Sequence, residues 1–271
     1  KDVTMAFREK YYQRIDPQQL LALSQNKGWG YVIGWAHRLT GVLLLLYALL
    51  HINTLSSLTQ PEIFSRKAEM FSGPVFVLFE WLLAVPVIFH CLNGGRLLVY
   101  ELFTTRHDDL LRSWVGTLSI VYLLLLGYFM YLGNQMVSPH FFWLTAMIIG
   151  VLVTYPCALK IRRSKGSFFW KLQRVSGALL FVLVPAHMLF MHLNPAVGRD
   201  VETITERLSQ PLIGVLDAVL LLCILYHGGY GICGVVKDYT ADRRAVKVIS
   251  GAVIVILVLF GLRGIALVGS F

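Results

Sequence analysis

The chain has 271 residues, of which 56% are hydrophobic and only 14% are charged, and its mean hydropathy is +0.66. Soluble proteins carry about 25% charged residues, so this composition excludes a soluble globular domain as well as a disordered or collagen-like chain. The net charge of +9 does not indicate a nucleic-acid-binding protein, because a basic excess on so apolar a chain is typical of loops that face an anionic membrane leaflet. The composition predicts an integral membrane protein.

Seven stretches are long and apolar enough to cross a bilayer as helices, which need about 20 residues each. The segment that precedes them, residues 1–30, is polar and has no apolar core of its own, so we do not interpret it as a signal peptide. We therefore expect an all-α integral membrane protein with seven transmembrane helices, at 31–55, 74–100, 114–132, 141–161, 170–193, 211–236 and 246–268.

The distribution of basic residues predicts the orientation of these spans. The N-terminal segment and the stretches 101–112, 160–171 and 237–247, together with the adjoining helix ends, carry 19 of the 24 Lys and Arg residues. Short loops rich in Lys and Arg stay in the cytoplasm. We therefore expect a cytoplasmic N-terminus and an external C-terminus.

The second half of the chain repeats the first at an offset of 136 or 137 residues. In the first expected span, the sequence HRLTG begins at His37 and is followed by His51; in the fifth, QRVSG begins at Gln173 and is followed by His187. The second and sixth expected spans share a further set at equal spacing: Pro74, Glu80, His90, Gly94 and Glu101 against Pro211, Asp217, His227, Gly231 and Asp238.

This offset predicts two three-helix repeats, residues 31–137 and 166–271, that follow a cytoplasmic segment, 1–30. A unit with three spans ends on the wrong side of the membrane for a second unit to begin in the same orientation. One additional crossing solves this, so we interpret residues 138–165 as a linker helix with a topological rather than a chemical role.

Four histidines occupy repeated positions within apolar spans, where such side chains are rare and usually functional. His51 lies 20 residues beyond the start of its span, so it is about 30 Å across the membrane, and His187 is similarly late in an outward-going helix. His90 and His227 each precede an acidic residue at the cytoplasmic helix end by 11 positions, or about 16 Å. We expect an inner pair, His90 with His227, and an outer pair, His51 with His187.

Paired imidazoles predict the kind of cofactor. With no cysteine or carboxylate expected nearby, two imidazoles suit neither a tetrahedral zinc site nor a hard cation. They suit a six-coordinate haem iron that transfers electrons, so we predict two haem b groups, with histidines that only pack as the alternative. Small residues near the ligands would let a flat macrocycle approach the backbone, or let helices pack closely: Gly41, Gly94, Gly95, Gly177, Gly228, Gly229 and Gly231.

On these motifs the chain resembles the membrane-anchor cytochrome b of succinate dehydrogenases and fumarate reductases, with two small anchor subunits joined in one chain. The sequence HRLTG at His37 is similar to the H-R-x-[ST]-G motif of the first anchor, and the sequence from His90 to Glu101 is similar to its haem motif. The sequence from His227 to Tyr239 matches the H-x3-G-x6-D-Y motif of the other anchor. Histidines at positions 51 and 187 follow the pattern of two-haem members.

The resemblance implies that His90 and His227 hold the haem nearer the catalytic subunits, and that a quinone, ubiquinone or menaquinone, binds at the cytoplasmic face. It implies that Arg38 and Tyr239 border the quinone with Asp238 in support, although Tyr239 could instead be an aromatic anchor at the membrane interface. Gly34 stands where some ubiquinone-reducing members carry serine. Arg38 could also pair with a haem propionate, and this role can coexist with quinone binding. Four basic residues could pair with propionates in this way: His37, Arg38, Arg96 and Arg174.

The resemblance also implies partners, because the chain has neither a cysteine cluster for an iron–sulfur centre nor a nucleotide-binding unit for a flavin. We expect a flavoprotein subunit, which would oxidise succinate, and an iron–sulfur subunit, both docked on the cytoplasmic face. The complex of these subunits would be a succinate:quinone oxidoreductase in the lipid of the prokaryotic cytoplasmic membrane. It could form a higher oligomer, and we expect no nucleic acid as a partner.

The roles of two acidic residues remain open, and two other classes of protein are alternatives to the anchor function. Glu80 and Asp217 are six residues inside their outer helix ends, where they could reach the interface, exchange protons or border a second quinone pocket. The cytochrome b of a hydrogenase or a formate dehydrogenase also carries haem on paired histidines. A secondary transporter can also have internal repeats, but interrupted helices are more typical of it than paired histidines.

Overall fold

The computed structural model describes residues 28–103, 108–132, 139–192 and 197–271, and within these ranges all regular structure is helical. Seven of the described helices are long and apolar enough to cross a membrane, which confirms the predicted fold class. The long helices are α3 (Trp29–Leu55), α5 (Pro74–Phe103), α6 (Asp108–Leu132), α7 (Pro139–Arg162), α8 (Phe168–Met191), α10 (Pro211–Tyr239) and α11 (Arg243–Val268). The expected cytoplasmic segment, 1–30, lies almost wholly outside the described residues.

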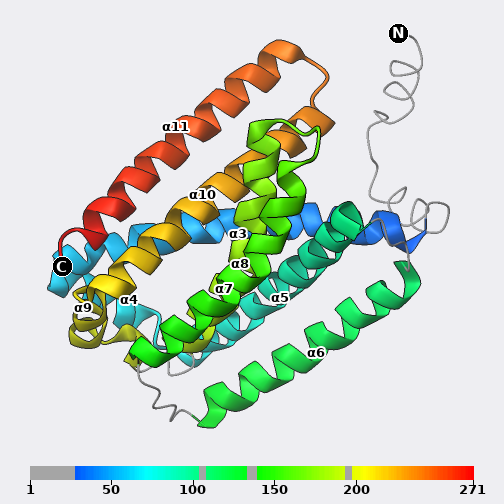
Figure 1. Ribbon diagram of the computed structural model, residues 1–271. Coiled ribbons are helices and arrows are strands. Elements are labelled where there is room, and N and C mark those ends of the chain that lie inside the picture. Colours follow the sequence, from blue (N-terminus) through cyan, green and yellow to red (C-terminus); the bar gives the residue numbers. More distant parts are fainter. Residues whose placement is uncertain (1–27, 104–107, 133–138, 193–196) are drawn as a thin grey trace, which may run out of the picture.

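Four helices form the centre of the molecule. Helix α3 packs against α5 and α10, and α8 packs against the same two helices, so the four make a closed ring (Figure 1). Helix α6 lies on α5 at one side of this ring, and α11 lies on α10 and α3 at the opposite side. Every histidine of the two expected pairs belongs to a central helix.

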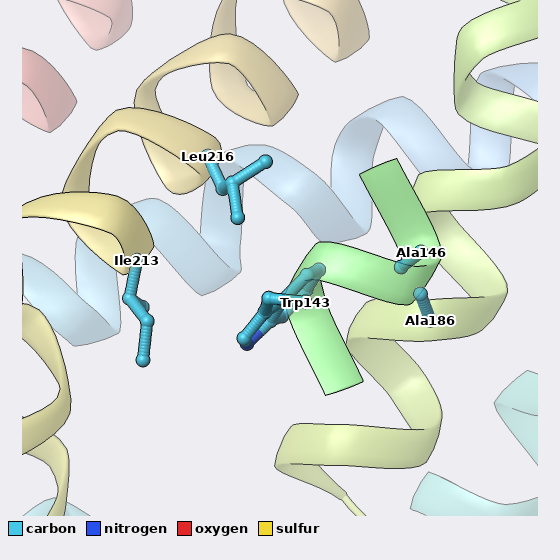
Figure 2. Packing of buried hydrophobic residues seen from close by; sticks show 5 residues of the cluster. All are labelled: Trp143, Ala146, Ala186, Ile213 and Leu216. Atoms are coloured by element: carbon cyan, nitrogen blue, oxygen red, sulfur yellow. The ribbon is translucent and has the colours of Figure 1, made fainter. Parts of the chain in front are cut away.

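Helix α7, the expected linker, packs along α8 and inserts one large side chain into the interior. Trp143 of α7 is only 1% exposed and is buried in one apolar cluster with Ala186 of α8 and with Ile213 and Leu216 of α10 (Figure 2). Ala186 precedes His187 in the chain. The linker helix therefore supports the wall beside the outer histidine pair.

Short helices cover one end of the bundle, and the sequence analysis did not predict them. They are η1 (Ser56–Thr59), α4 (Pro61–Met70), η2 (Val197–Arg199) and α9 (Val201–Leu208). A proline in its first turn favours the start of α4, and the side chain of Asp200 caps α9 by accepting a hydrogen bond from the Thr203 amide. We call this end, marked by α4 and α9, the outer end, and the opposite end, marked by Arg38 and Arg174, the inner end.

Apolar contacts hold the short helices in place. Leu58 and Phe64 are buried together with Leu267 from the end of α11, and Ile204 and Leu208 of α9 pack against this cluster. A helix as short as α9 has little stability of its own, so this burial accounts for its position. The outer end is thereby a fixed cover rather than a loose loop.

Candidate functional site

A cavity of about 590 Å³ runs along the interior of the four central helices. Most of its lining is apolar, and it reaches from Arg38 and Arg174 at the inner end to His192 and Arg207 at the outer end. Pockets that bind cofactors and other small molecules commonly have volumes of about 300–1,000 Å³ and few polar groups. Both expected histidine pairs line this one cavity: His51, His90, His187 and His227.

The structure brings the histidines together in the predicted combinations and with nearly equal geometry. The ring centroids of His90 and His227 are 6.4 Å apart, and those of His51 and His187 are 6.2 Å apart. The ring planes cross at 87° in both pairs. A metal bound to two imidazoles at about 2 Å from each nitrogen separates the nitrogens by about 4 Å and the ring centres by roughly 6 Å. The spacing of both pairs therefore fits a single metal atom between the rings.

Hydrogen bonds orient the inner pair for ligation. Nδ1 of His90 lies 3.1 Å from the carbonyl oxygen of His37, and Nδ1 of His227 lies 3.2 Å from the carbonyl oxygen of Gln173. A carbonyl can only accept, so in each histidine Nδ1 carries the proton and Nε2 keeps a free electron pair. Metal-binding histidines are commonly fixed in this way. The two acceptors are equivalent under the offset of 136 residues.

Two glycines provide the space that the inner rings occupy. A Cβ atom added at Gly41 would lie 2.9 Å from Cε1 of His90, and one added at Gly177 would lie 2.9 Å from Cε1 of His227. Both distances are well below ordinary carbon–carbon contact. The two glycines, again 136 residues apart, therefore let each imidazole lie directly against the facing helix.

Replacing Gly41 with alanine is expected to weaken binding of a cofactor at the inner pair, by on the order of tenfold, as changes behind metal ligands commonly do. The His90 ring must shift, and Nε2 shifts with it. Haem content per purified complex, measured by absorbance, checks this result. Gly34→Ala on the same helix is the matched control, because its new Cβ would meet nothing within 4 Å. Equal haem content in the two variants would contradict this account of Gly41.

The outer pair has a polar neighbourhood that the sequence analysis missed. His192, just beyond the end of α8, brings a third imidazole, and ligand atoms of His51, His187 and His192 all lie within 4.8 Å of one another. A carboxylate oxygen of Asp217 lies 3.9 Å from Nδ1 of His187. The expectation that no carboxylate lies near the paired imidazoles is therefore wrong at the outer pair. The periodicity of the spans gave no signal for His192, which has no histidine at the equivalent position of the first half.

Glu80 links several elements at the outer end. Its carboxylate lies 2.8 Å from Nδ1 of His192 and 2.9 Å from the guanidinium of Arg199. All three side chains are largely buried. Glu80 of α5 thus contacts both His192, just beyond the end of α8, and Arg199 of η2. These contacts do not fit the interpretation of an acid that simply reaches water at the interface.

Asp217 has a different environment, although it is the equivalent of Glu80 in the second half. Its Oδ1 atom and Nδ1 of His187 are both buried, and neither makes a hydrogen bond within the described residues. The two atoms are 3.9 Å apart, which is too far for a hydrogen bond. A small shift of either side chain would bring them within hydrogen-bond distance. Asp217 is therefore placed to orient the His187 ring.

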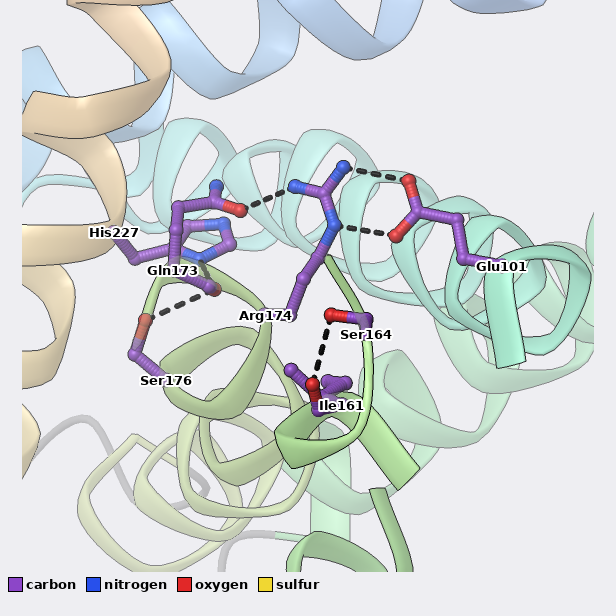
Figure 3. A network of polar contacts seen from close by, with 7 residues as sticks. All are labelled: Glu101, Ile161, Ser164, Gln173, Arg174, Ser176 and His227. Carbon is purple, nitrogen blue, oxygen red and sulfur yellow. Dashed lines mark hydrogen bonds and ion pairs between the residues drawn. The ribbon is translucent and has the colours of Figure 1, made fainter. Parts of the chain in front are cut away.

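Two reciprocal ion pairs close the inner end. Arg38 of α3 pairs with Asp238 of α10 at 3.0 Å. Arg174 of α8 binds both carboxylate oxygens of Glu101 in α5, at 2.5 and 2.6 Å, and also the side chain of Gln173 (Figure 3). Each pair thus joins the first helix of one expected repeat to the second helix of the other.

The expected quinone residues gather around Arg38. The Tyr239 ring centre lies 5.9 Å from the Arg38 guanidinium carbon, and the Trp35 ring lies 5.8 Å from the Tyr239 ring. The side chains of Arg38 and Asp238 are 44% and 54% exposed. The group is therefore an open cluster of a cation, a carboxylate and a phenol at the inner end, which a partner or ligand could cover.

The remaining basic residues expected to bind propionates divide into two kinds. The His37 ring lines the cavity and stacks on His90, with centroids 4.0 Å apart. Arg96 is buried, donates to the side chain of Asn93 at 2.9 Å, and is not among the described side chains that line the cavity. His37 is thus beside the inner pair, whereas Arg96 lies behind the wall.

Comparisons with known proteins found similar membrane-anchor sequences. A sequence model of the succinate dehydrogenase/fumarate reductase transmembrane subunit matches residues 25–153 and again residues 154–262. The succinate dehydrogenase hydrophobic membrane anchor subunit of Archaeoglobus fulgidus is 31% identical over 75 residues, which are 28% of this chain and 64% of that protein. The chain thus matches less than two thirds of this relative's length. No solved structure matches the chain. The two successive family matches, which meet within α7, agree with the expected joining of two anchor subunits.

Proposed function

The chain belongs to the succinate dehydrogenase/fumarate reductase transmembrane subunit family, and on this premise we propose that it is a two-haem anchor that passes electrons between an iron–sulfur partner and membrane quinone. The family match favours this function over a hydrogenase or formate dehydrogenase cytochrome and over a transporter. The observation that carries the proposal is the presence of two histidine pairs of equal geometry in one cavity.

The donor set and its surroundings fit haem b. Each pair offers two neutral imidazoles on opposite walls, as a six-coordinate iron without an open position requires. When bound, two haems would supply one-electron carriers, one near each end of the cavity. The chain holds the inner ligands by the carbonyls of His37 and Gln173 and gives them room at Gly41 and Gly177. His37, Arg38 and Arg174 are the basic groups at the inner end of the cavity that could bind propionates.

We propose that quinone binds at the cluster of Arg38, Asp238 and Tyr239. A quinone carbonyl needs a hydrogen-bond donor, and it gains negative charge as it is reduced. The Tyr239 hydroxyl can donate, and the Arg38 guanidinium can stabilise the charge. Asp238 holds Arg38 in position through their ion pair at 3.0 Å. Trp35 supplies an apolar wall next to the tyrosine.

The open inner end fits the docking of catalytic partners. The half-exposed Arg38–Asp238 pair needs a cover if quinone is to react away from water. A flavoprotein subunit that oxidises succinate and an iron–sulfur subunit at this end would provide that cover and deliver electrons beside the inner histidine pair. This chain would then be a subunit of succinate:quinone oxidoreductase without the dicarboxylate site, in the prokaryotic cytoplasmic membrane.

Replacing Tyr239 with phenylalanine is expected to lower succinate–quinone reductase activity by on the order of tenfold or more, because one donor to the reacting oxygen is lost. Haem content and succinate oxidation with an artificial acceptor should not change. Tyr155→Phe is the matched control, since Tyr155 is a 61% exposed residue of α7. Unchanged quinone reduction in the Tyr239 variant would mean that this tyrosine is an interfacial anchor only.

A further inference from the structure

Arg207 has an unusual position among the arginines of the cavity. Within the described lining, three arginines face the cavity, and they are Arg38, Arg174 and Arg207. The first two pair with carboxylates at the inner end. Arg207, the one of the three at the outer end, has no carboxylate within ion-pair distance among the described residues. Glu80, also at the outer end, pairs with His192 and Arg199.

Arg207 is firmly seated. Its guanidinium carbon lies 4.8 Å from the centre of the Phe190 ring, and Nη1 lies 3.5 Å from the sulfur of Met191. Phe190 in turn stacks on Phe142 and contacts Trp143 of α7. Helix α9, capped by Asp200 and packed on Leu58 and Leu267, fixes the backbone that carries the arginine.

The electrostatic state of Arg207 leaves room for an anion. Burial lowers the pKa of its guanidinium from the ordinary value, and the charge of the neighbouring Glu206 raises it again. The guanidinium is nevertheless charged at neutral pH. A partly buried cation without an ion-paired carboxylate is stabilised by an anion that enters the cavity at this point.

The position of Arg207 relative to His187 indicates which anion. Phe190 and Met191, on which the guanidinium rests, follow His187 by three and four residues, so they lie about 5–6 Å further toward the outer end. A ligand held by His51 and His187 would lie in the same cavity as Arg207. An anionic group of that ligand on its outer side would be near the guanidinium of Arg207, which rests on Phe190 and Met191.

We propose that Arg207 binds the carboxylates of the ligand held by His51 and His187, that is, the propionates of the outer haem. This inference rests on the proposed two-haem function and adds to it an anchor that no repeated motif predicts. It gives the outer site a cation of its own, as Arg38 provides one at the inner end. The anionic oxygens of a phospholipid headgroup have the same chemistry, so the test must distinguish the two sources.

The test is a redox titration of both haems in the purified complex that carries Arg207→Gln. A nearby cation stabilises the reduced haem, which has one more electron, so its loss should lower the outer midpoint potential. We expect about a tenfold change in the reduction equilibrium constant, equivalent to about 59 mV for one electron. The inner potential should not move. Arg207→Lys, which keeps the charge, should shift the outer potential less and guards against failure of the glutamine variant to assemble.

Arg263→Gln is the matched control. Arg263 is an exposed arginine near the outer end of α11, and it is not among the described residues that line the cavity. Two haems in the wild-type complex with an unchanged outer potential in Arg207→Gln would overturn this inference and leave the two-haem function intact. Loss of bound phospholipid in that variant, measured as phosphorus per complex, without a change in potential would instead assign the site to a headgroup. A wild-type complex without an outer haem would overturn both proposals.

Discussion

Replacement of His90 or His227 by alanine is expected to remove one of two haems and to stop electron transfer from succinate to quinone. These two rings face each other at 6.4 Å, and each is tied to a backbone carbonyl that leaves Nε2 free. Loss of either ring would leave a haem iron held at this pair with only one imidazole from the chain. Haem content should fall by half, and activity with quinone should collapse while succinate oxidation with an artificial acceptor persists.

The equivalence of the two variants is the control for this prediction. His90 and His227 belong to different halves of the chain, so only a shared cofactor makes their losses identical. Haem is measured against flavin in the purified complex, because loss of a bound cofactor also lowers the stability of the state that binds it. Low-temperature spectra that lack different haems in the two variants would contradict the pairing.

Replacement of His51 or His187 by alanine is expected to remove the other haem and to leave the inner one in place. The rings face each other at 6.2 Å, and neither belongs to the inner ligand set. The spectrum that remains should be the complement of that left by His90→Ala. Quinone reduction at the inner end should survive in part, since the inner ligands and the Arg38 cluster are unchanged.

A variant of His192 distinguishes a haem site from a tetrahedral metal site at the outer pair. Three imidazoles within 4.8 Å could also hold zinc, which binds three histidines and a water in some enzymes. We expect His192→Ala to keep two haems per complex, because the role of His192 is its contact at 2.8 Å with Glu80. Loss of zinc, with no change in haem, from both His192→Ala and His51→Ala would contradict haem ligation by the outer pair.

The sequence was sufficient to predict the spans and the combinations of histidines. Hydropathy identifies long apolar helices regardless of how they pack, and the equal spacing within each half sets the depth of each ligand. The short helices α4 and α9 escaped, because their few residues carry mixed polarity and acquire their structure by packing on Leu58, Phe64 and Leu267. Because α9 was not predicted, the sequence analysis assigned no role to Arg207.

The pairing of charges at the inner end could not be predicted in the same way. The sequence places Arg38 and Arg174 at equivalent positions and gives both a role with propionates. Only the packing of the four central helices decides that Arg174 binds both oxygens of Glu101, whereas Arg38 pairs with a half-exposed Asp238 next to Tyr239. The equivalent positions therefore differ in what they can offer a ligand.

His192 and Glu80 illustrate the same limit at the outer end. His192 lies outside the repeat, so no repeated position predicts a role for it. From the sequence alone, Glu80 is only an acid near a helix end. Their contact at 2.8 Å joins residues 112 positions apart in the chain. Such long-range contacts depend on the positions of α5 and α8 in the bundle, which hydropathy does not specify.

The most direct test of the two-haem proposal is the ratio of haem b to polypeptide in the intact wild-type complex, determined together with flavin. Two histidine pairs of matching geometry along one cavity predict two haems for each chain and each flavin. A ratio of one haem per chain, or spectra in which His51 and His90 coordinate the same iron, would contradict it.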